Sequence, residues 1–136
     1  MRETDVDTME MMKSMPMGSM PMDMMAMQDC IQSLNACSMA ATMCAGADMT
    51  EMDMAKCTAM CSNMADMADA TMRMMMRPAG MDMEVMKAML MACMTMGKAC
   101  AAECRMHADM AEHCRYCAMA CDDMVMKCEA MMAQVA

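Results

Sequence analysis

The spacing of the cysteines between Cys93 and Cys128 constrains this chain most. Within this stretch they are separated by three, four or seven residues in two groups: Cys93, Cys100 and Cys104, then Cys114, Cys117, Cys121 and Cys128. Such steps return to one face of an α-helix, whereas a strand would place successive side chains on alternating faces. The spacing therefore predicts two helices, each with a stripe of thiols along one side.

A short polar turn from Arg105 to Asp109 separates these helices, which makes them antiparallel neighbours with facing stripes. Steps of three and four residues predict a buried seam on each helix. On the first helix this seam consists of Met86, Met89, Cys93, Met96, Cys100, Cys104 and His107. On the second helix it consists of Met110, Cys114, Cys117, Cys121, Met124, Cys128 and Met131. Methionine at these positions is consistent with ordinary packing. So many thiols are not, because leucine would bury more apolar area.

The segment from His113 to Cys121 reads H-C-x-x-C-x-x-x-C, and Cys100-x-x-x-Cys104 precedes a charged turn that carries His107. With these motifs the chain resembles the copper storage proteins from about Gln28 to its C-terminus. The resemblance implies a cysteine-lined four-helix bundle that binds many Cu(I) ions through thiolates, and a homo-oligomer such as a tetramer. The chain departs from that family in its methionine content, for example at Met96 and Met124, where cysteine is expected.

The rest of the chain completes the predicted bundle. Cys30, Cys37 and Cys44 are seven residues apart on a first helix over 22–45, which Gly46 ends, and Cys57 and Cys61 lie on a second helix that ends at 76. The other two helices are expected over 81–107 and 109–134. We therefore predict an all-α fold, an antiparallel up-down-up-down four-helix bundle over residues 22–136. Asp48 or Thr50 is expected to cap the second helix.

Residues 1–21 are expected to form a methionine-rich N-terminal extension, with a short helix over 4–14. The sequence from Met15 to Pro21 contains two prolines and a glycine, which break a helix. This stretch is either a plain linker or, by resemblance, one of the methionine-spaced Cu(I) motifs of copper trafficking proteins.

The composition argues against several classes of function. The chain has 12 Cys, 37 Met, no Trp or Phe and a net charge of −9, which argues against binding to nucleic acid or anionic membranes. It has no uncharged apolar run of 18 residues and no signal-peptide pattern at its N-terminus, so we expect a cytoplasmic protein without a membrane span. Leucine occurs only at Leu34 and Leu90, which favours an engineered variant of a natural scaffold.

Twelve buried thiolates without counterions would be too costly, so most must be neutral thiols before metal binds. One Cu(I) per thiolate restores neutrality and predicts roughly one copper per cysteine, with loading that depends on pH. The candidate ligands are Cys30, Cys37, Cys44, Cys57, Cys61, Cys93, Cys100, Cys104, Cys114, Cys117, Cys121 and Cys128. The pairs Cys57/Cys61, Cys100/Cys104 and Cys117/Cys121 can each supply two ligands from one helix.

A softer rim of ligands is expected at one end of the bundle. His107 keeps the phase of Cys100, so it is either a solvated turn residue or points into the bundle, where Met43, Met49 and Met110 could pass copper to the thiolates. His113 is one step off the thiol phase, which leaves a solvated turn residue as its simplest interpretation.

Other functions fit less well. A structural zinc site needs four ligands, usually from two C-x-x-C pairs in loops, and the stripes show no obvious unit of four. No pattern for a redox or hydrolytic active site is present, so we do not expect an enzyme. The remaining alternative is a methionine-core redesign that tests packing, with incidental metal binding.

Overall fold

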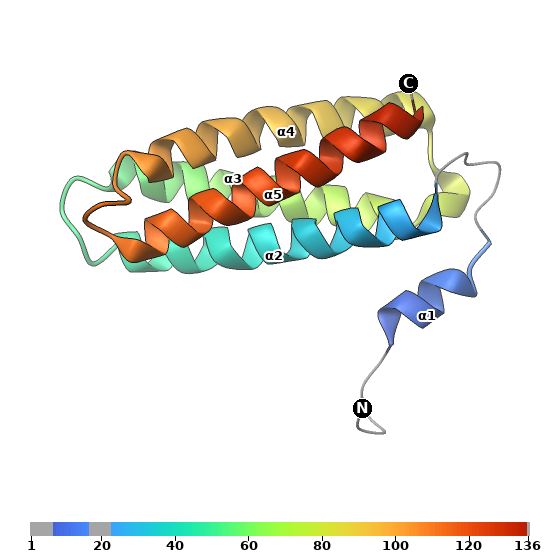
Figure 1. The fold of residues 1–136 in the computed structure, drawn as a ribbon, viewed down its shortest axis with the longest axis horizontal. Helices are drawn as coiled ribbons and strands as arrows, with labels where there is room; N and C mark the ends of the chain where they lie inside the picture. The colour runs from blue at the N-terminus through green and yellow to red at the C-terminus, as the bar shows by residue number, and fades with distance from the viewer. Residues whose placement is uncertain (1–6, 17–22, 136) are drawn as a thin grey trace.

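The computed structural model describes residues 7–16 and 23–135 (Figure 1). Four long helices form a bundle: α2 (Met24–Asp48), α3 (Ala55–Met75), α4 (Met83–Arg105) and α5 (Glu112–Val135). A short helix, α1 (Thr8–Lys13), precedes them, and a 3-10 helix, η1 (Pro78–Gly80), connects α3 to α4. No strand occurs among the described residues. The predicted all-α four-helix bundle is confirmed.

Polar caps and a proline set several helix boundaries. Asp23 accepts a hydrogen bond from the backbone N–H of Met25, and Asp82 accepts from the first turn of α4. Pro78 follows the end of α3, where its ring prevents the helix from continuing. The predicted stop at Gly46 was wrong, because α2 continues to Asp48. A glycine costs a helix only about 1 kcal/mol relative to alanine, which tertiary packing can offset.

The four long helices form a closed square in cross-section. α2 packs beside α3 and α5, and α4 packs beside the same two helices, so α2 and α4 lie diagonally opposite. Successive helices run in opposite directions, which confirms the up-down-up-down order (Figure 1). The connections 49–54 and 106–111 lie together at one end, here called the His113 end. The connection 76–82 lies at the other, the Pro78 end.

The interior of the square holds most of the predicted sulfur seams, but Met89 and Met96 of α4 are only half-buried. All twelve cysteines are buried, and each is at most 1% exposed. The buried methionines of the interior include Met27, Met54, Met64, Met86, Met124 and Met131. Met110 was also placed in a seam, and this prediction was wrong, because Met110 is 93% exposed. It lies in the connection before α5, which begins at Glu112 rather than at 109.

The N-terminal helix α1 packs near the start of the bundle. Met12 is buried, and α1 shares an apolar pocket with Ile31 of α2 and Met76 at the end of α3. The short helix predicted over 4–14 is thus present over Thr8–Lys13. Most of the methionine-spaced segment from Met15 to Pro21 lies outside the described residues.

Helix α4 is long and apolar enough to cross a membrane, judged by length and composition alone. Core helices of other bundles meet the same criterion. Here its buried face contributes Cys93, Cys100 and Cys104 to the interior.

Candidate metal centre

The closest contacts between thiols join different helices. The Sγ–Sγ distances are 3.9 Å for Cys30–Cys128, Cys37–Cys121 and Cys57–Cys104, 3.8 Å for Cys44–Cys114, Cys61–Cys100 and Cys61–Cys117, and 3.7 Å for Cys61–Cys104. A disulfide would need about 2.05 Å. The cysteines are therefore free thiols, and their stripes meet along the bundle axis.

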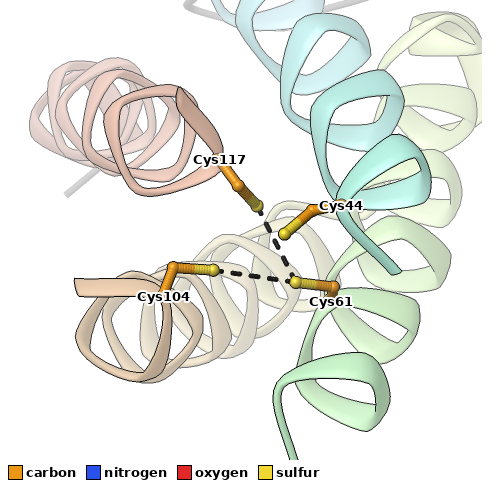
Figure 2. Close-up of side chains that lie close together, drawn as sticks. All are labelled: Cys44, Cys61, Cys104 and Cys117. Atoms are coloured by element: carbon orange, nitrogen blue, oxygen red, sulfur yellow. Dashed lines mark hydrogen bonds between the residues drawn. The ribbon is translucent and has the colours of Figure 1, made fainter. Parts of the chain in front are cut away.

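At the centre of this arrangement four thiols converge, one from each long helix. Figure 2 shows Cys44, Cys61, Cys104 and Cys117 pointing at one another, with all four Sγ atoms within 4.8 Å. All four side chains are buried. The expectation that the stripes contain no unit of four thiols was therefore wrong, because the unit is assembled across helices and no spacing within one helix reveals it.

Further ligand groups overlap with this quartet. Cys117 is shared with a group that adds Cys100 and Cys121, and Cys44 and Cys61 are shared with a group that adds Asp48 and Cys57. Neighbouring groups thus use the same sulfur atoms. A thiolate that belongs to two groups can bridge two metal ions, so the geometry suits a metal cluster better than isolated sites.

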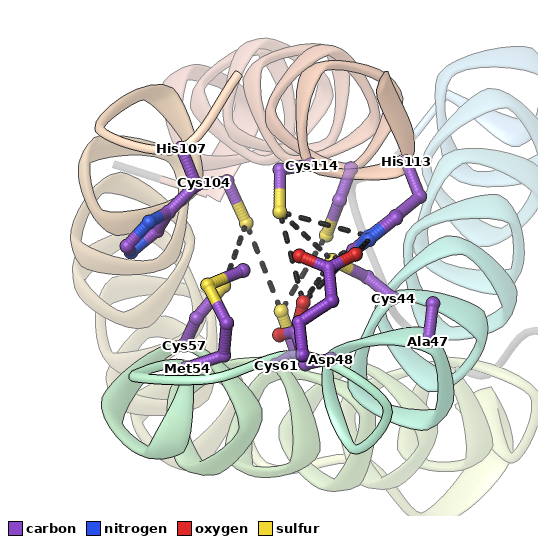
Figure 3. A network of polar contacts seen from close by, with 12 residues as sticks. Cys44, Ala47, Asp48, Met54, Cys57, Cys61, Cys104, His107, His113 and Cys114 are labelled. Carbon is purple, nitrogen blue, oxygen red and sulfur yellow. Dashed lines mark hydrogen bonds and ion pairs between the residues drawn. The ribbon is translucent and has the colours of Figure 1, made fainter. Parts of the chain in front are cut away.

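At the His113 end the thiols meet a histidine and a carboxylate (Figure 3). His113 Nδ1 lies 3.3 Å from Cys44 Sγ and 3.6 Å from Cys114 Sγ. Asp48 Oδ1 lies 3.7 Å from Cys114 Sγ and 3.7 Å from His113 Nδ1. The other imidazole nitrogen, Nε2, is 3.0 Å from a carboxylate oxygen of Glu51. Cys44, Asp48, His113 and Cys114 form one potential metal-binding group.

The sequence reasoning missed the part that Asp48 and His113 play in this group. Asp48 was expected to cap the next helix, but it is the last residue of α2 and its side chain is fully buried. His113 was interpreted as a solvated residue, but its side chain is only 28% exposed. The available signal was the adjacent pair His113 and Cys114 at the start of a helix. At that position both side chains can reach the end of the bundle interior.

The surroundings of each group set its protonation. The Cys104 contact disfavours a thiolate at Cys44, but hydrogen bonds from Cys117, Cys61 and His113 outweigh it and lower the pKa of Cys44 to about 6. Burial raises the pKa of the Asp48 carboxyl. Burial opposes protonation of His113, but hydrogen bonds to Glu51 and Cys44 outweigh it and raise its pKa. A thiolate at Cys44 beside a protonated His113 is therefore favoured.

At several other thiols, burial favours the neutral form. It raises the pKa of Cys57 and of Cys114. At Cys93 a contact with Cys128, together with burial, also raises the thiol pKa. Binding of a cation at these thiols must therefore release protons.

The other predicted rim residues lie apart from the thiols. Met43, Met49 and Met110 are 65, 78 and 93% exposed. His107 Nε2 is 2.9 Å from a carboxylate oxygen of Glu103, and the ring lies to one side of the thiols in Figure 3. Among the described residues, His107 belongs to none of the potential metal-binding groups that contain a cysteine.

Comparison with known proteins agrees with a metal-binding role for these thiol groups. Residues 23–133 match the family model described as "Copper storage protein". The chain belongs to the copper storage protein family. Curated protein sequences gave no match. A solved structure of Ccsp, the copper storage protein from Streptomyces lividans, loaded with 10 copper equivalents is similar, with 36% identity and a TM-score of 0.88. The match covers 93% of this chain and 98% of that chain.

Two further solved structures of the Streptomyces lividans protein are also similar. A histidine-to-alanine variant of Ccsp has 39% identity and a TM-score of 0.82, over 85% of this chain and 99% of that one. A cytosolic copper storage protein with five coppers has 40% identity and a TM-score of 0.78, over 79% of this chain and 92% of that one. The resemblance inferred from the cysteine motifs and the predicted function of copper storage are confirmed. The alternative, a packing design with incidental metal binding, finds no support.

Proposed function

We propose that this copper storage protein holds its copper as Cu(I), bound to the thiolates of the twelve buried cysteines. The overlapping thiol groups around Cys44, Cys61 and Cys117 carry this proposal. Thiolate is a soft ligand that favours Cu(I), and a low-dielectric interior strengthens its attraction to a cation. The single charge of Cu(I) also matches the single charge of each thiolate that it requires.

Charge balance supports a capacity of roughly one copper per cysteine. A buried thiolate without a partner is costly, and so is an unbalanced buried cation. Equal numbers of Cu(I) and thiolate keep the interior neutral. Thiols shared between groups, such as Cys61 with its contacts to Cys100, Cys104 and Cys117, allow each thiolate to bridge ions.

Copper enters, in this proposal, at the His113 end. His113 is partly exposed, and its Nδ1 lies beside two buried thiols. The protonated imidazole stabilises the Cys44 thiolate before copper binds, and Glu51 and Asp48 in turn stabilise the protonated ring. Cys44, with its lowered pKa, is then the first thiolate that an incoming ion meets.

Delivery of copper by His107, Met43, Met49 and Met110 stays a prediction. Met49 and Met110 lie in the connections at the His113 end, and their exposed thioethers are soft, neutral and weak ligands. His107 follows α4 at the same end. Such residues could bind copper briefly without contributing to the stored load.

Cellular context is part of the proposal. Reduced thiols persist in the cytosol, and one of the similar solved structures is described as cytosolic. We place this protein in the cytoplasm as well. The predicted homo-oligomer, such as a tetramer, is carried over from the family resemblance.

A titration of the reduced protein with Cu(I) in the presence of a strong chelator tests the function. We expect the protein to retain close to one copper per cysteine. The control is a variant with all twelve cysteines replaced by serine, which keeps all 37 methionines. It should retain almost none. Tight binding of many ions by the serine variant would transfer the storage role to the methionines.

Zinc is the second candidate, because the quartet of Cys44, Cys61, Cys104 and Cys117 supplies four thiol ligands. A parallel titration with Zn²⁺ distinguishes the metals. A zinc protein would saturate at one or two tightly held ions and would lose them only slowly to Cu(I). A copper store would bind many Cu(I) ions and would release its bound zinc immediately when Cu(I) is added.

A further inference from the structure

A second kind of sulfur site lies nearer the Pro78 end of the bundle. The thioether sulfur of Met124 on α5 is 3.5 Å from Cys128 Sγ and 3.8 Å from Cys93 Sγ. All three side chains are fully buried. Cys30 Sγ lies 3.9 Å beyond Cys128. Among the described residues, Met124 is the methionine for which the structure shows contacts between its sulfur and cysteine thiols.

A glycine on the facing helix makes room for Met124. A Cβ atom at Gly97 would lie 2.6 Å from Met124 Cε and 2.8 Å from a methyl carbon of Val125. Neither distance is tolerable without movement. Gly97 lies in the middle of α4, where glycine costs about 1 kcal/mol relative to alanine. The end of the Met124 side chain thus rests against α4 only because residue 97 has no side chain.

These distances suit a metal ion with three sulfur ligands. A metal–sulfur bond of about 2.3 Å, as in zinc–thiolate sites, separates the sulfurs of a trigonal site by about 4 Å. The two contacts of Met124 fall slightly below that value, so small side-chain rotations would open the site. Thioether and thiolate are both soft ligands that favour Cu(I).

We propose that Met124, Cys93 and Cys128 form a mixed thioether–thiolate Cu(I) site, distinct from the all-thiolate groups near His113. The inference rests on the proposed function, since copper must first enter the bundle. Binding releases the two thiol protons, leaves copper as Cu(I) and leaves the thioether chemically unchanged. Met124 is thus a ligand rather than a packing residue.

Charge explains why a thioether serves here. Two thiolates and one Cu(I) carry a net charge of −1, and a third thiolate would make it −2 in a fully buried place. Among the described residues, no basic side chain hydrogen-bonds to these three sulfur atoms, unlike Cys44 with its neighbouring His113. A neutral third ligand completes the coordination without adding charge, which a low-dielectric interior favours.

The decisive experiment is a crystal structure of the copper-loaded wild-type protein, with anomalous scattering at the copper edge. We expect a copper ion bonded to Met124 Sδ and to Sγ of Cys93 and Cys128, at about 2.3 Å. Copper elsewhere in the bundle, with no ion bonded to Met124 Sδ, would overturn the assignment while leaving storage intact. A wild-type protein that binds no copper would overturn the proposed function itself.

Two variants test the site in solution, with retained copper measured against a strong chelator. Met124→Leu keeps the apolar volume but removes the sulfur, and it should retain one equivalent less. Gly97→Ala keeps the sulfur but displaces it, and it should lose the same equivalent. The control Met131→Leu changes another fully buried methionine of α5 and should match wild type. Wild-type capacity in both test variants would contradict the proposal, and the wild-type crystal decides it if either variant fails to fold.

Discussion

His113 Nδ1 lies 3.3 Å from the sulfur of Cys44, on a helix 69 residues away in sequence. His113 is out of phase with the thiol stripe of its own helix, so it points across toward α2 instead of down the axis. Glu51 contacts the other side of the imidazole, and the buried Asp48 carboxylate lies 3.7 Å from Nδ1. The imidazole therefore lies between solvent and the buried thiols of Cys44 and Cys114.

We predict that His113→Ala slows copper uptake by roughly tenfold, the lower range for loss of a group that orients a metal ligand. Capacity should be unchanged, because the thiols remain. The rate can be followed by stopped-flow absorbance of the copper–thiolate bands. Tyr116→Ala is the control, because Tyr116 is an exposed residue of the same helix and packs against Arg115 instead of a thiol. Equal slowing in both variants would contradict a specific role for His113.

The position of Cys61 predicts an unequal effect of removing different thiols. Cys61 contacts Cys100, Cys104 and Cys117, whereas Cys30 contacts only Cys128 among the described thiols. If stored ions share bridging thiolates, Cys61→Ser should lower the retained copper by more than Cys30→Ser does. Chelator-competition titrations of both variants measure this difference. Equal losses would mean that each thiolate serves its own ion.

Most of the fold could be predicted from the sequence because the helical period of the cysteines is unambiguous. The predicted inward positions on α2 and α3, such as Cys37 and Cys61, are buried. Helix ends were less certain. Gly46 looked like a stop but lies within α2, and Met110 looked like the first seam residue of α5 but is exposed. Both errors arise because tertiary packing decides whether the first or last turn of a helix forms.

The site was only partly predictable for a different reason. Periodicity tells which side chains face inward, and it gave all twelve cysteines. It does not give the stagger of one helix against another, which brings Cys61 and Cys117 of diagonal helices to 3.8 Å. That stagger also creates the quartet and places Asp48 beside Cys114. Spacing within a helix cannot encode a contact across the bundle.

Copper should stabilise the fold strongly. A ligand that binds only the folded state adds about 2.7 kcal/mol at a free concentration of 100 times its Kd, and several sites add further. Methionine specifies a core less sharply than leucine, so the copper-free bundle should melt early. Thermal melts under anaerobic, reducing conditions should show a large rise in Tm with Cu(I). Unchanged midpoints would place the copper outside the bundle.

The buried carboxylate of Asp48 should weaken the copper-free fold at neutral pH. Its side chain is fully buried, and its Oδ2 atom has no hydrogen-bond partner among the described residues. Burial raises the pKa of Asp48 above that of the unfolded chain. The folded state therefore holds the proton more tightly, so stability is greatest below the unfolded pKa and falls as pH rises through the folded pKa.

Asp48→Asn removes this charge, and we predict a copper-free protein that is more stable than wild type at pH 7. The expected gain is about 1 kcal/mol, the lower end of the cost of a buried polar group without a partner. The gap should close near pH 3, where Asp48 is protonated in both states. Asp66→Asn, at an exposed position of α3, is the control and should change little at either pH. Urea unfolding of the reduced proteins at both pH values measures the differences, and a variant less stable than wild type at pH 7 would show that the ion pair with His113 outweighs the burial cost.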